Sequence, residues 1–467
     1  MPEIGAPGGD LHMLAASSRD TRLLVVYGYA RLVGYDLDLN LVPDILAGVE
    51  IEDGRVFTFR LRDGHRWSDG APFTTEDFRY YWEDVATDDQ LSPFGPPWQL
   101  LANTEPPRVD VVDPLTIRYT WSTPNPYFLP ALAAARPIFI YRPAHYLKQF
   151  HEKYTDPASL ALRVEEDLAR DWAQLHGRRD RMYRFDNPDL PTLQPWANRT
   201  KPPASRFTAD RNPHYHRVDE TGQQLPYVDR VILDVVDSKL IPLKTGAGET
   251  DLQSRGLAFK DYTFLKSSEE YSHLDTLLWR SGRGAHLALY PNLNADDPGW
   301  RSLFRDPRFR RALSLAVNRE DINKTFYFGL GLTGNNSVLP ESPLYEDAFR
   351  YDWAEFDLVR ANQLLDDMGL TRRDSRGVRL MPDGRPMDLI IELSGQGTEQ
   401  TDVLELIAET WLEIGIQIFT KPLQREVLRN RIFAGSTLMT MWFGLENGIP
   451  SADMSPQEFA PTNQQQY

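Results

Sequence analysis

Cysteine is absent from all 467 residues of this chain, and its absence removes several kinds of site at once. Without thiols the chain can form neither a disulfide bond nor a zinc site built on thiolates. Long apolar runs are also missing: the longest near the start covers residues 23–26, far below the roughly 18–20 residues of a membrane-spanning helix. That run is too short even for the core of a signal peptide, so we expect the signal of an exported protein to be missing from this sequence.

Positive charge is scarce relative to negative charge. The chain has 51 Lys and Arg residues against 67 Asp and Glu residues, which gives a formal net charge of −16 at pH 7. Nucleic acids and anionic membrane surfaces repel such a chain at long range, so we expect neither as a partner. The chain also exceeds the roughly 250–300 residues at which single hydrophobic cores stop growing. We therefore expect two or three core-forming units.

The most informative stretch is residues 56–85, VFTFRLRDGHRWSDGAPFTTEDFRYYWEDV. At its start Phe57, Phe59 and Leu61 alternate with polar residues, which is the period of a strand with one buried face. The Asp-Gly pair at 63–64 then predicts a tight turn, and the Ser-Asp-Gly triplet that follows predicts a second one.

A helix is predicted directly after these turns. Thr74 is a typical N-cap residue, and Asp77 stands three residues later, in the place of a capping-box acid. The apolar residues that follow recur at helical spacing and predict one buried face: Phe78, Tyr81, Trp82 and Val85. These patterns together predict a strand, a doubly turned connection and a capped amphipathic helix.

The order of residue types in this stretch is also specific. The pattern F-T-F-x-L-R-x-G-x-x-W-S-D-G-x-P-F-T-x-E-D-F resembles the signature of the extracellular solute-binding proteins of family 5. That family serves ABC importers and includes binders of dipeptides, oligopeptides, oligosaccharides, opines and nickel. Three further stretches extend the resemblance over nearly the whole chain: GYARLVGYD at 28–36, GQQLPYVDRV at 222–231 and RDPRFRRALSLAVNREDIN at 305–323.

The resemblance implies an α/β fold with the two-lobed architecture of type II periplasmic binding proteins, in which helices flank mixed sheets. It implies that residues 1–40 and 185–270 form the main sheet of lobe I and that residues 41–184 form an extra subdomain of that lobe. Residues 271–467 would form lobe II, and the hinge would lie near residue 270. Family members return to lobe I at their C-terminus, and we expect that return to be missing from this sequence.

Local patterns give further expectations. Residues 1–20 are rich in Gly and Ser and are expected to be irregular, whereas residues 23–29 are expected to form the first strand. Residues 109–119 are interrupted by Asp-Pro and predict a hairpin. Past about residue 275 strands and helices alternate, with a strand predicted over 287–293 and a capped helix over 357–369.

The sequence matches to motifs for catalysis, nucleotide binding and metal binding lack the context that such sites require. The G-x-G-x-x-G match at 329–334 follows a predicted helix, whereas a nucleotide site needs a strand before the loop and a helix after it. The pairs His214/His216 and His145/His151 lack a third ligand at suitable spacing. No G-x-S-x-G nucleophile elbow occurs. We expect no catalytic residue, no cofactor and no metal.

Aromatic residues make up 11% of the chain and supply most of the candidate ligand contacts. Trp82 and Trp411 fall at helical core spacing and are expected to be packed inside. Aromatic residues at predicted strand ends or in loops can contact a solute, because their faces suit sugar rings and peptide side chains alike. The candidate ligand-binding residues are Tyr27, Tyr29, Trp98, Trp279, Asn294, Trp442 and Glu446.

One departure from the family leaves the ligand open. Peptide binders of the family hold the α-amino group of the peptide with an aspartate in a D-x-x-D-P-like segment. The matching region here reads WFGLENGIPSAD at 442–453, in which Glu446 or Asp453 would have to take that role. The departure raises oligosaccharide or opine-like ligands as alternatives to a peptide.

The sequence therefore predicts a monomeric periplasmic receptor of an ABC importer. A small-molecule solute, peptide or oligosaccharide, would bind between the lobes and favour their closure by hinge motion, because only the closed form lets it contact both. The membrane permease subunits would recognise the closed form. The alternatives are a secreted hydrolase of oligosaccharides or peptides, and a periplasmic sensor or chaperone partner.

Overall fold

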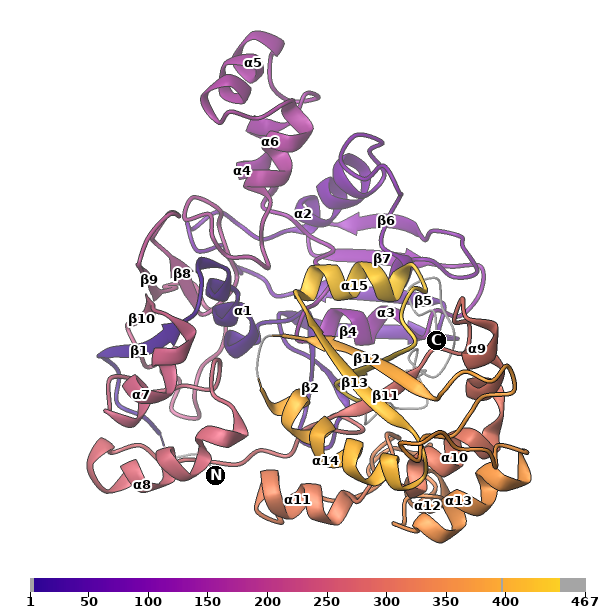
Figure 1. Ribbon diagram of the computed structural model, residues 1–467. Helices are drawn as coiled ribbons and strands as arrows, with labels where there is room; N and C mark the ends of the chain where they lie inside the picture. Colours follow the sequence, from indigo (N-terminus) through magenta and orange to yellow (C-terminus); the bar gives the residue numbers. More distant parts are fainter. Residues whose placement is uncertain (1–3, 396–397, 446–467) are drawn as a thin grey trace. The chain divides into compact units, whose positions relative to one another are not determined.

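The computed structural model describes residues 4–395 and 398–445, and the chain divides into two compact units, Met1–Thr276 and Leu277–Tyr467 (Figure 1). Each unit has its own sheets and its own hydrophobic core. None of the helices within the described ranges combines the length and the apolar character needed to cross a bilayer.

The first unit contains a four-stranded sheet in the order β1-β10-β9-β8. β1 (Asp10–Ala15) runs parallel to β10 (Arg230–Val235), and β9 (Arg206–Arg211) pairs antiparallel with both β10 and β8 (Trp196–Asn198). Its core is a separate small cluster of apolar side chains: Met13, Ala15, Leu24, Val25, Phe185, Phe207, Ala209, Val231 and Leu233.

Two expectations for the start of the chain are wrong. Residues 23–29 do not form a strand: α1 (Leu23–Gly28) is a helix, and the strand lies earlier, in the stretch expected to be irregular. A run of four apolar residues cannot by itself distinguish a buried strand from one turn of a buried helix. The parallel partner β10 decides the outcome, because it pairs with every residue of β1.

The first unit also contains an antiparallel sheet in the order β4-β5-β7-β6. Its strands are β4 (Leu46–Glu52), β5 (Val56–Leu61), β7 (Thr116–Thr120) and β6 (Arg108–Asp113), so the predicted strand at 56–61 and the predicted hairpin at 109–119 are confirmed. Phe57, Phe59 and Leu61 are all buried, as their alternation predicted. Asp53 and Gly54 both have positive φ, which a tight hairpin turn requires.

The predicted capping box is confirmed. The Thr74 hydroxyl accepts a hydrogen bond from the backbone N–H of Glu76, and the Asp77 carboxylate accepts one from the backbone N–H of Thr74. The helix α2 (Thr75–Tyr80) then continues into one π-helical turn, Tyr81–Ala86.

The other elements of the first unit are short. A two-stranded sheet joins β2 (Val33–Tyr35) to β3 (Leu41–Pro43). The remaining helices are α3 (Phe128–Ala133), α4 (Ala144–Leu147), α5 (Pro157–Glu166), α6 (Trp172–Arg179), α7 (Ile241–Gly246) and α8 (Tyr262–Ser272).

The second unit is built on one mixed sheet in the order β11-β14-β12-β13. β12 (Asp388–Ser394), β13 (Gln417–Leu423) and β14 (Met439–Trp442) are parallel, and β11 (Ala288–Pro291) runs antiparallel to β14. The strand predicted at 287–293 is thus confirmed.

Helices cover both faces of this sheet (Figure 1). Leu389, Ile391 and Leu393 of β12 belong to the same core cluster as α14 (Glu399–Glu413), whose Trp411 is buried as predicted. Successive strand residues point to opposite faces, and Glu392 accordingly forms an ion pair with Arg431 of α15 (Arg425–Phe433). The remaining helices are α9 (Pro298–Arg305), α10 (Pro307–Leu315), α11 (Arg319–Tyr327), α12 (Asp347–Tyr351) and α13 (Leu358–Asp367), the last being the predicted capped helix.

Candidate functional site

The carboxyl edge of the sheet in the second unit is the best candidate for a ligand site. Ser394 at the end of β12 pairs with Leu423 at the end of β13, and Trp442 ends β14 at the same edge. In open α/β sheets with helices on both faces, ligands bind in the crevice outside the carboxyl ends of the strands. The strand order of the second unit therefore predicts a ligand site at this edge.

A cavity lies at this edge. Its volume is about 300 Å³, and it is lined by Gly395 after β12 and by residues 422–426 at the junction of β13 and α15. Arg425 from this lining extends over Trp442, with its guanidinium carbon 5.5 Å from the centroid of the indole ring. Trp442 in turn meets Phe443 edge to face, with the ring centroids 5.5 Å apart. The edge thus presents two aromatic rings beside a cation.

A second group of side chains lies at the same edge, where α14 begins and β11 starts. The Glu399 carboxylate accepts a hydrogen bond from the Tyr327 hydroxyl at 3.0 Å, and its Oε1 atom also lies 3.0 Å from Nε2 of His286. Burial, followed by the neighbouring Glu399 carboxylate, raises the pKa of Tyr327, so the phenol stays protonated and donates. Since the Glu399 side chain is 38% exposed, it can also meet a ligand.

Aromatic contacts join these two groups. The His286 ring lies edge to face with Tyr327 at 5.4 Å and with Phe443 at 6.2 Å, measured between ring centroids. Arg283 places its guanidinium carbon 4.2 Å from the centroid of Phe443. The result is a wall of aromatic faces with a carboxylate and two guanidinium groups beside it. Such a wall can hold a solute through stacking, hydrogen bonds and charge, all of which are reversible.

Among the predicted residues of the second unit, Trp442 lies at this edge. Asn294 follows β11 at the opposite edge, where Pro291 pairs with Met439, and its side-chain oxygen accepts a hydrogen bond from Arg305 at 2.9 Å. Trp279 is 80% exposed in the segment before β11. Glu446 lies outside the described residues.

The predicted residues of the first unit lie on and around α1 and α3. Tyr27 on α1 hydrogen-bonds Ser254 through its hydroxyl at 2.6 Å. Tyr29 ends α1 with φ of 43°, and its hydroxyl donates to the carbonyl of Ala133 at the C-terminal end of α3. Trp98 is 48% exposed and meets Tyr127, just before α3, edge to face at 5.2 Å. Tyr29 and Trp98 therefore contact opposite ends of one short helix.

We did not predict His286, Tyr327, Glu399 or Arg425 as site residues from the sequence. A signal for two of them was present. Glu399 and Arg425 each begin the helix that follows a parallel strand, β12 or β13, and the start of such a helix lies at the carboxyl edge of the sheet. His286 and Tyr327 precede β11 and end α11, and only the folded chain brings them beside Glu399.

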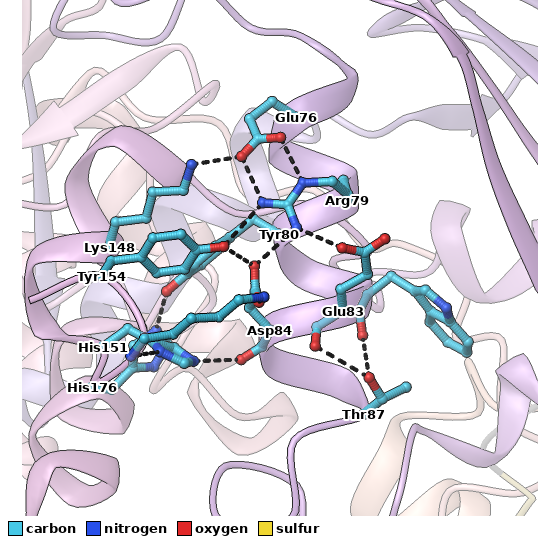
Figure 2. A network of polar contacts seen from close by, with 12 residues as sticks. Glu76, Arg79, Tyr80, Glu83, Asp84, Thr87, Lys148, His151, Tyr154 and His176 are labelled. Atoms are coloured by element: carbon cyan, nitrogen blue, oxygen red, sulfur yellow. Dashed lines mark hydrogen bonds and ion pairs between the residues drawn. The ribbon is translucent and has the colours of Figure 1, made fainter.

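A polar network around the buried Asp84 in the first unit is the alternative candidate for a site (Figure 2). It joins α2 and the π-helical turn to the segment after α4. Its charged members are Arg79, Lys148 and Lys153 on one side and Glu76, Glu83 and Asp84 on the other. Each cation contacts at least one of these carboxylates, and three positive charges meet three negative charges. A network that is neutral and internally paired stabilises the fold and offers no unmatched charge to a ligand.

His216 and the glycine-rich stretch at 329–334, two other motifs found in the sequence, have structural explanations. His216 directs Nε2 to the Asp44 carboxylate at 2.8 Å, and among the described residues no three potential metal-ligating side chains form a metal site. The glycine-rich stretch 329–334 follows α11 and forms a surface loop in which Leu332 is 87% exposed.

Comparisons with known proteins agree with this architecture. The family model described as bacterial extracellular solute-binding proteins, family 5 Middle, matches residues 40–466. The solved structure of an oligopeptide-binding protein OppA is 32% identical, has a TM-score of 0.73, and is matched over 95% of this chain and 70% of its own. The periplasmic binding protein MelB of Agrobacterium fabrum, in complex with stachyose, is 20% identical with a TM-score of 0.69, over 98% of this chain and 70% of its own.

Curated relatives fall into the same group. The periplasmic alpha-galactoside-binding protein of Rhizobium meliloti is 23% identical over 403 residues, and the periplasmic oligopeptide-binding protein OppA of Escherichia coli is 24% identical over 360 residues. These matches cover 82% and 72% of this chain but only 54% and 56% of the relatives, so the chain spans little more than half of their length. The predicted mixed α/β fold of the type II periplasmic binding proteins is confirmed. The chain belongs to family 5 of the bacterial extracellular solute-binding proteins.

Proposed function

We propose that this chain is the solute-binding receptor of an ABC importer and that it captures an oligopeptide-like solute. The proposal is supported by family membership and by the 32% identity to an oligopeptide-binding protein. Its relatives are named as periplasmic proteins, so we place this receptor in the periplasm, as a monomer that delivers its solute to the membrane permease subunits. It acts by binding and release, without chemical conversion of the solute.

The observation that carries the proposal is the aromatic and charged wall at the carboxyl edge of the second unit. Trp442, Phe443 and Arg425 lie beside a cavity of about 300 Å³, and Glu399 faces the same edge. This volume is at the lower end of the range for small-molecule sites, and the wall beside it offers flat faces for apolar parts and opposite charges for polar parts.

The two units would act as the two lobes. We propose that residues 1–40 and 185–270 form the main part of lobe I, that 41–184 form its extra subdomain, and that 271–467 form lobe II. A hinge near residue 270 would let the lobes close on the solute. Tyr27, Tyr29 and Trp98 would contact the solute from lobe I, and Trp279, Trp442 and Glu446 from lobe II. Asn294 lies at the opposite edge of the sheet from Trp442, so it would contact only a solute long enough to reach both edges. Closure would be favoured because only the closed form makes both sets of contacts.

An oligosaccharide is the second candidate solute. The relative from Rhizobium meliloti is named as an alpha-galactoside-binding protein, and the structure of MelB contains stachyose. Sugar rings stack on exposed aromatic faces, and Trp98 and Trp279 offer such faces at 48% and 80% exposure. An opine-like solute remains a further alternative.

The test is calorimetric titration of the purified protein with oligopeptides of three to five residues and, separately, with stachyose. We expect one class to bind, and we expect Trp442→Ala to weaken that binding about tenfold or more, because aromatic anchors carry much of the energy of binding sites. Tyr351→Ala is the matched control: this aromatic residue is 55% exposed on α12, and its removal should leave the affinity unchanged.

Two results would contradict the proposal. The protein would not be a receptor for these solutes if neither class bound, and it would be a hydrolase if mass spectrometry found the bound solute cleaved. Unchanged affinity of Trp442→Ala, with an unchanged circular dichroism spectrum, would remove the carboxyl edge from the binding site.

A further inference from the structure

The carboxylate of Asp44, in the connection between β3 and β4, is bonded to two other segments of the first unit. Its carboxylate lies 2.8 Å from Nε2 of His216, and it accepts two hydrogen bonds from Arg217, through Nε at 2.9 Å and Nη2 at 2.7 Å. The backbone N–H of Arg31 donates to the same carboxylate at 2.9 Å. Only 12% of the Asp44 side chain is exposed, so these bonds are shielded from water.

This arrangement holds Tyr29 in place. Tyr29 has φ of 43°, a left-handed conformation that costs free energy for a residue with a side chain and that surrounding contacts must stabilise. Arg217 supplies one such contact, since its Nη2 atom donates to the carbonyl oxygen of Tyr29 at 2.6 Å while the same guanidinium holds Asp44. Arg31 supplies another, with its guanidinium carbon 4.8 Å from the centroid of the Tyr29 ring.

A second histidine packs against this group. The ring of His65, in the turn after β5, lies 5.3 Å from the ring of His216 between centroids and 5.5 Å from Phe73. His65 is only 8% exposed, and neither of its ring nitrogens has a hydrogen-bond partner in the described part of the chain; the same holds for Nδ1 of His216. A proton added to His65 would therefore bring a charge and an unmatched donor into a buried place.

The charges around His65 mostly oppose that proton. His216 lies against it from the loop after β9, and Arg62 faces it from the end of β5, while only Asp44 attracts a positive charge there. Tyr215 and Arg217 flank His216 in that loop, and the pKa of Tyr215 is raised to about 12 by burial. Burial, then the neighbouring His216 and Arg62, lowers the pKa of His65 to about 4. The folded arrangement thus contains a neutral His65 at any pH above that value.

We propose that Asp44, His65, His216 and Arg217 form an acid-sensitive support for Tyr29, which opens and releases the Tyr29 turn when the surroundings become acidic. The consequence for solute release rests on the proposed function, because it requires Tyr29 to contact the solute. Within this support Arg217 and Asp44 are positioning residues for Tyr29, and His65 is the group that senses the proton.

The size of the effect follows from linkage. An opened, solvated His65 binds its proton with the ordinary pKa of about 6.5, whereas the closed support admits it only at about 4. Well inside this range each pH unit favours the open form nearly tenfold, and the opening equilibrium should rise by about 80-fold as the pH falls from 6.5 to 4.

Hydrogen exchange of the protein without any solute tests the support itself. Exchange would be followed by mass spectrometry in peptides covering residues 26–33 and 212–218, corrected for the pH dependence of the intrinsic rate. We expect their protection to fall by one to two orders of magnitude more between pH 6.5 and 4.5 than that of peptides covering β10, which report on the stability of the whole unit.

The variant His65→Phe keeps a buried ring that cannot be protonated, and it should remove most of this extra fall. His65→Leu would replace it if the Phe variant lost its native circular dichroism spectrum. His145→Phe is the control: His145 lies on the exposed surface and pairs with Asp69, outside the support, so its replacement should leave the pH profile as in the original protein. An unchanged profile in His65→Phe, or an equal fall in the β10 peptides, would overturn the proposal.

Solute binding then separates this inference from the proposed function. Calorimetric affinity for the oligopeptide or stachyose should fall at least tenfold between pH 6.5 and 4.5 in the original protein, and clearly less in His65→Phe. Absence of binding at every pH would refute the proposed function. The hydrogen-exchange experiment would still test the acid-sensitive support, because it is carried out without solute. Binding that weakens equally in both proteins would refute the link between the support and the solute.

Discussion

Replacing Asp84 with Asn tests whether the polar network of Figure 2, which surrounds this buried carboxylate, stabilises the first unit. The Asp84 side chain is only 1% exposed, and its carboxylate accepts hydrogen bonds from Lys153 at 2.5 Å, Tyr154 at 2.5 Å and Arg79 at 3.1 Å. Burial alone would raise the pKa of Asp84, but the bonds from Lys153 and Tyr154 outweigh it and hold the pKa below its ordinary value. The carboxylate is therefore charged at neutral pH.

The expected loss is about 3 kcal/mol in the free energy of unfolding. Breaking a buried ion pair by neutralising one partner costs about 3–5 kcal/mol. The lower end of that range applies here, because Lys153 is 56% exposed and can turn toward water, and Arg79 keeps its bonds to Glu76 and Glu83. The amide nitrogen of Asn would also face a donor instead of accepting a hydrogen bond from it.

Glu83→Gln is the matched control. Glu83 belongs to the same network and also pairs with Arg79, at 2.6 Å, but its side chain is 54% exposed. Exposed ion pairs contribute about 0–1 kcal/mol, so this variant should lose less than about 1 kcal/mol. The two variants remove the same charge from the same helical turn; they differ in burial and in the number of donors left behind, three for Asp84 and one for Glu83.

Native-state hydrogen exchange in urea measures the difference in unfolding free energy between the two variants at the helix that carries both substitutions. A chain with two compact units need not unfold in a single transition, so the free energy should be read from amides of residues 75–86 alone. Asp84→Asn should lose about 2 kcal/mol more than Glu83→Gln, which corresponds to about a 30-fold difference in the opening equilibrium. Equal losses in the two variants would show that burial adds nothing to this network.

Two further predictions concern backbone strain and pH. Gly415→Ala should destabilise the second unit by at least about 1 kcal/mol more than Gly369→Ala in urea unfolding. Both glycines have positive φ, but only at Gly415 would an added Cβ lie 2.5 Å from the Arg379 side chain. Equal losses in the two variants would contradict this prediction. Burial lowers the pKa of His176 to about 4, so the stabilisation from its neutral form is complete above about pH 6.5 and is lost, by about 3 kcal/mol, as the pH falls to 4. The urea midpoint of His176→Gln should accordingly change less with pH over that range than the midpoint of the original protein. An equal change in both proteins would show that protonation of His176 does not cause the loss of stability.

Local patterns were sufficient wherever neighbouring residues decide the structure. The alternation around Phe59 predicted β5, and the Thr74/Asp77 pair predicted the capping box of α2, because strand period and capping depend on residues within a few positions of one another. The long residue pattern at 57–78 identified the family, and the family model matches residues 40–466.

Local patterns failed where a distant partner decides. Residues 23–26 have strand-forming side chains, yet they begin α1, because the place beside β10 is taken by β1. Asn294 and Trp442 were both predicted as ligand contacts, and only the direction of β11 in the folded chain shows that they lie at opposite edges of one sheet.

The sequence by itself determined the family, the α/β class and the capped strand–turn–helix unit, because each depends on the order of residues along the chain. Only the tertiary structure decided which side chains meet. Glu399 meets His286 across 113 positions, and Asp44 meets His216 across 172 positions. Such contacts follow from strand order and from the helix positions it sets, and no spacing along the chain encodes them.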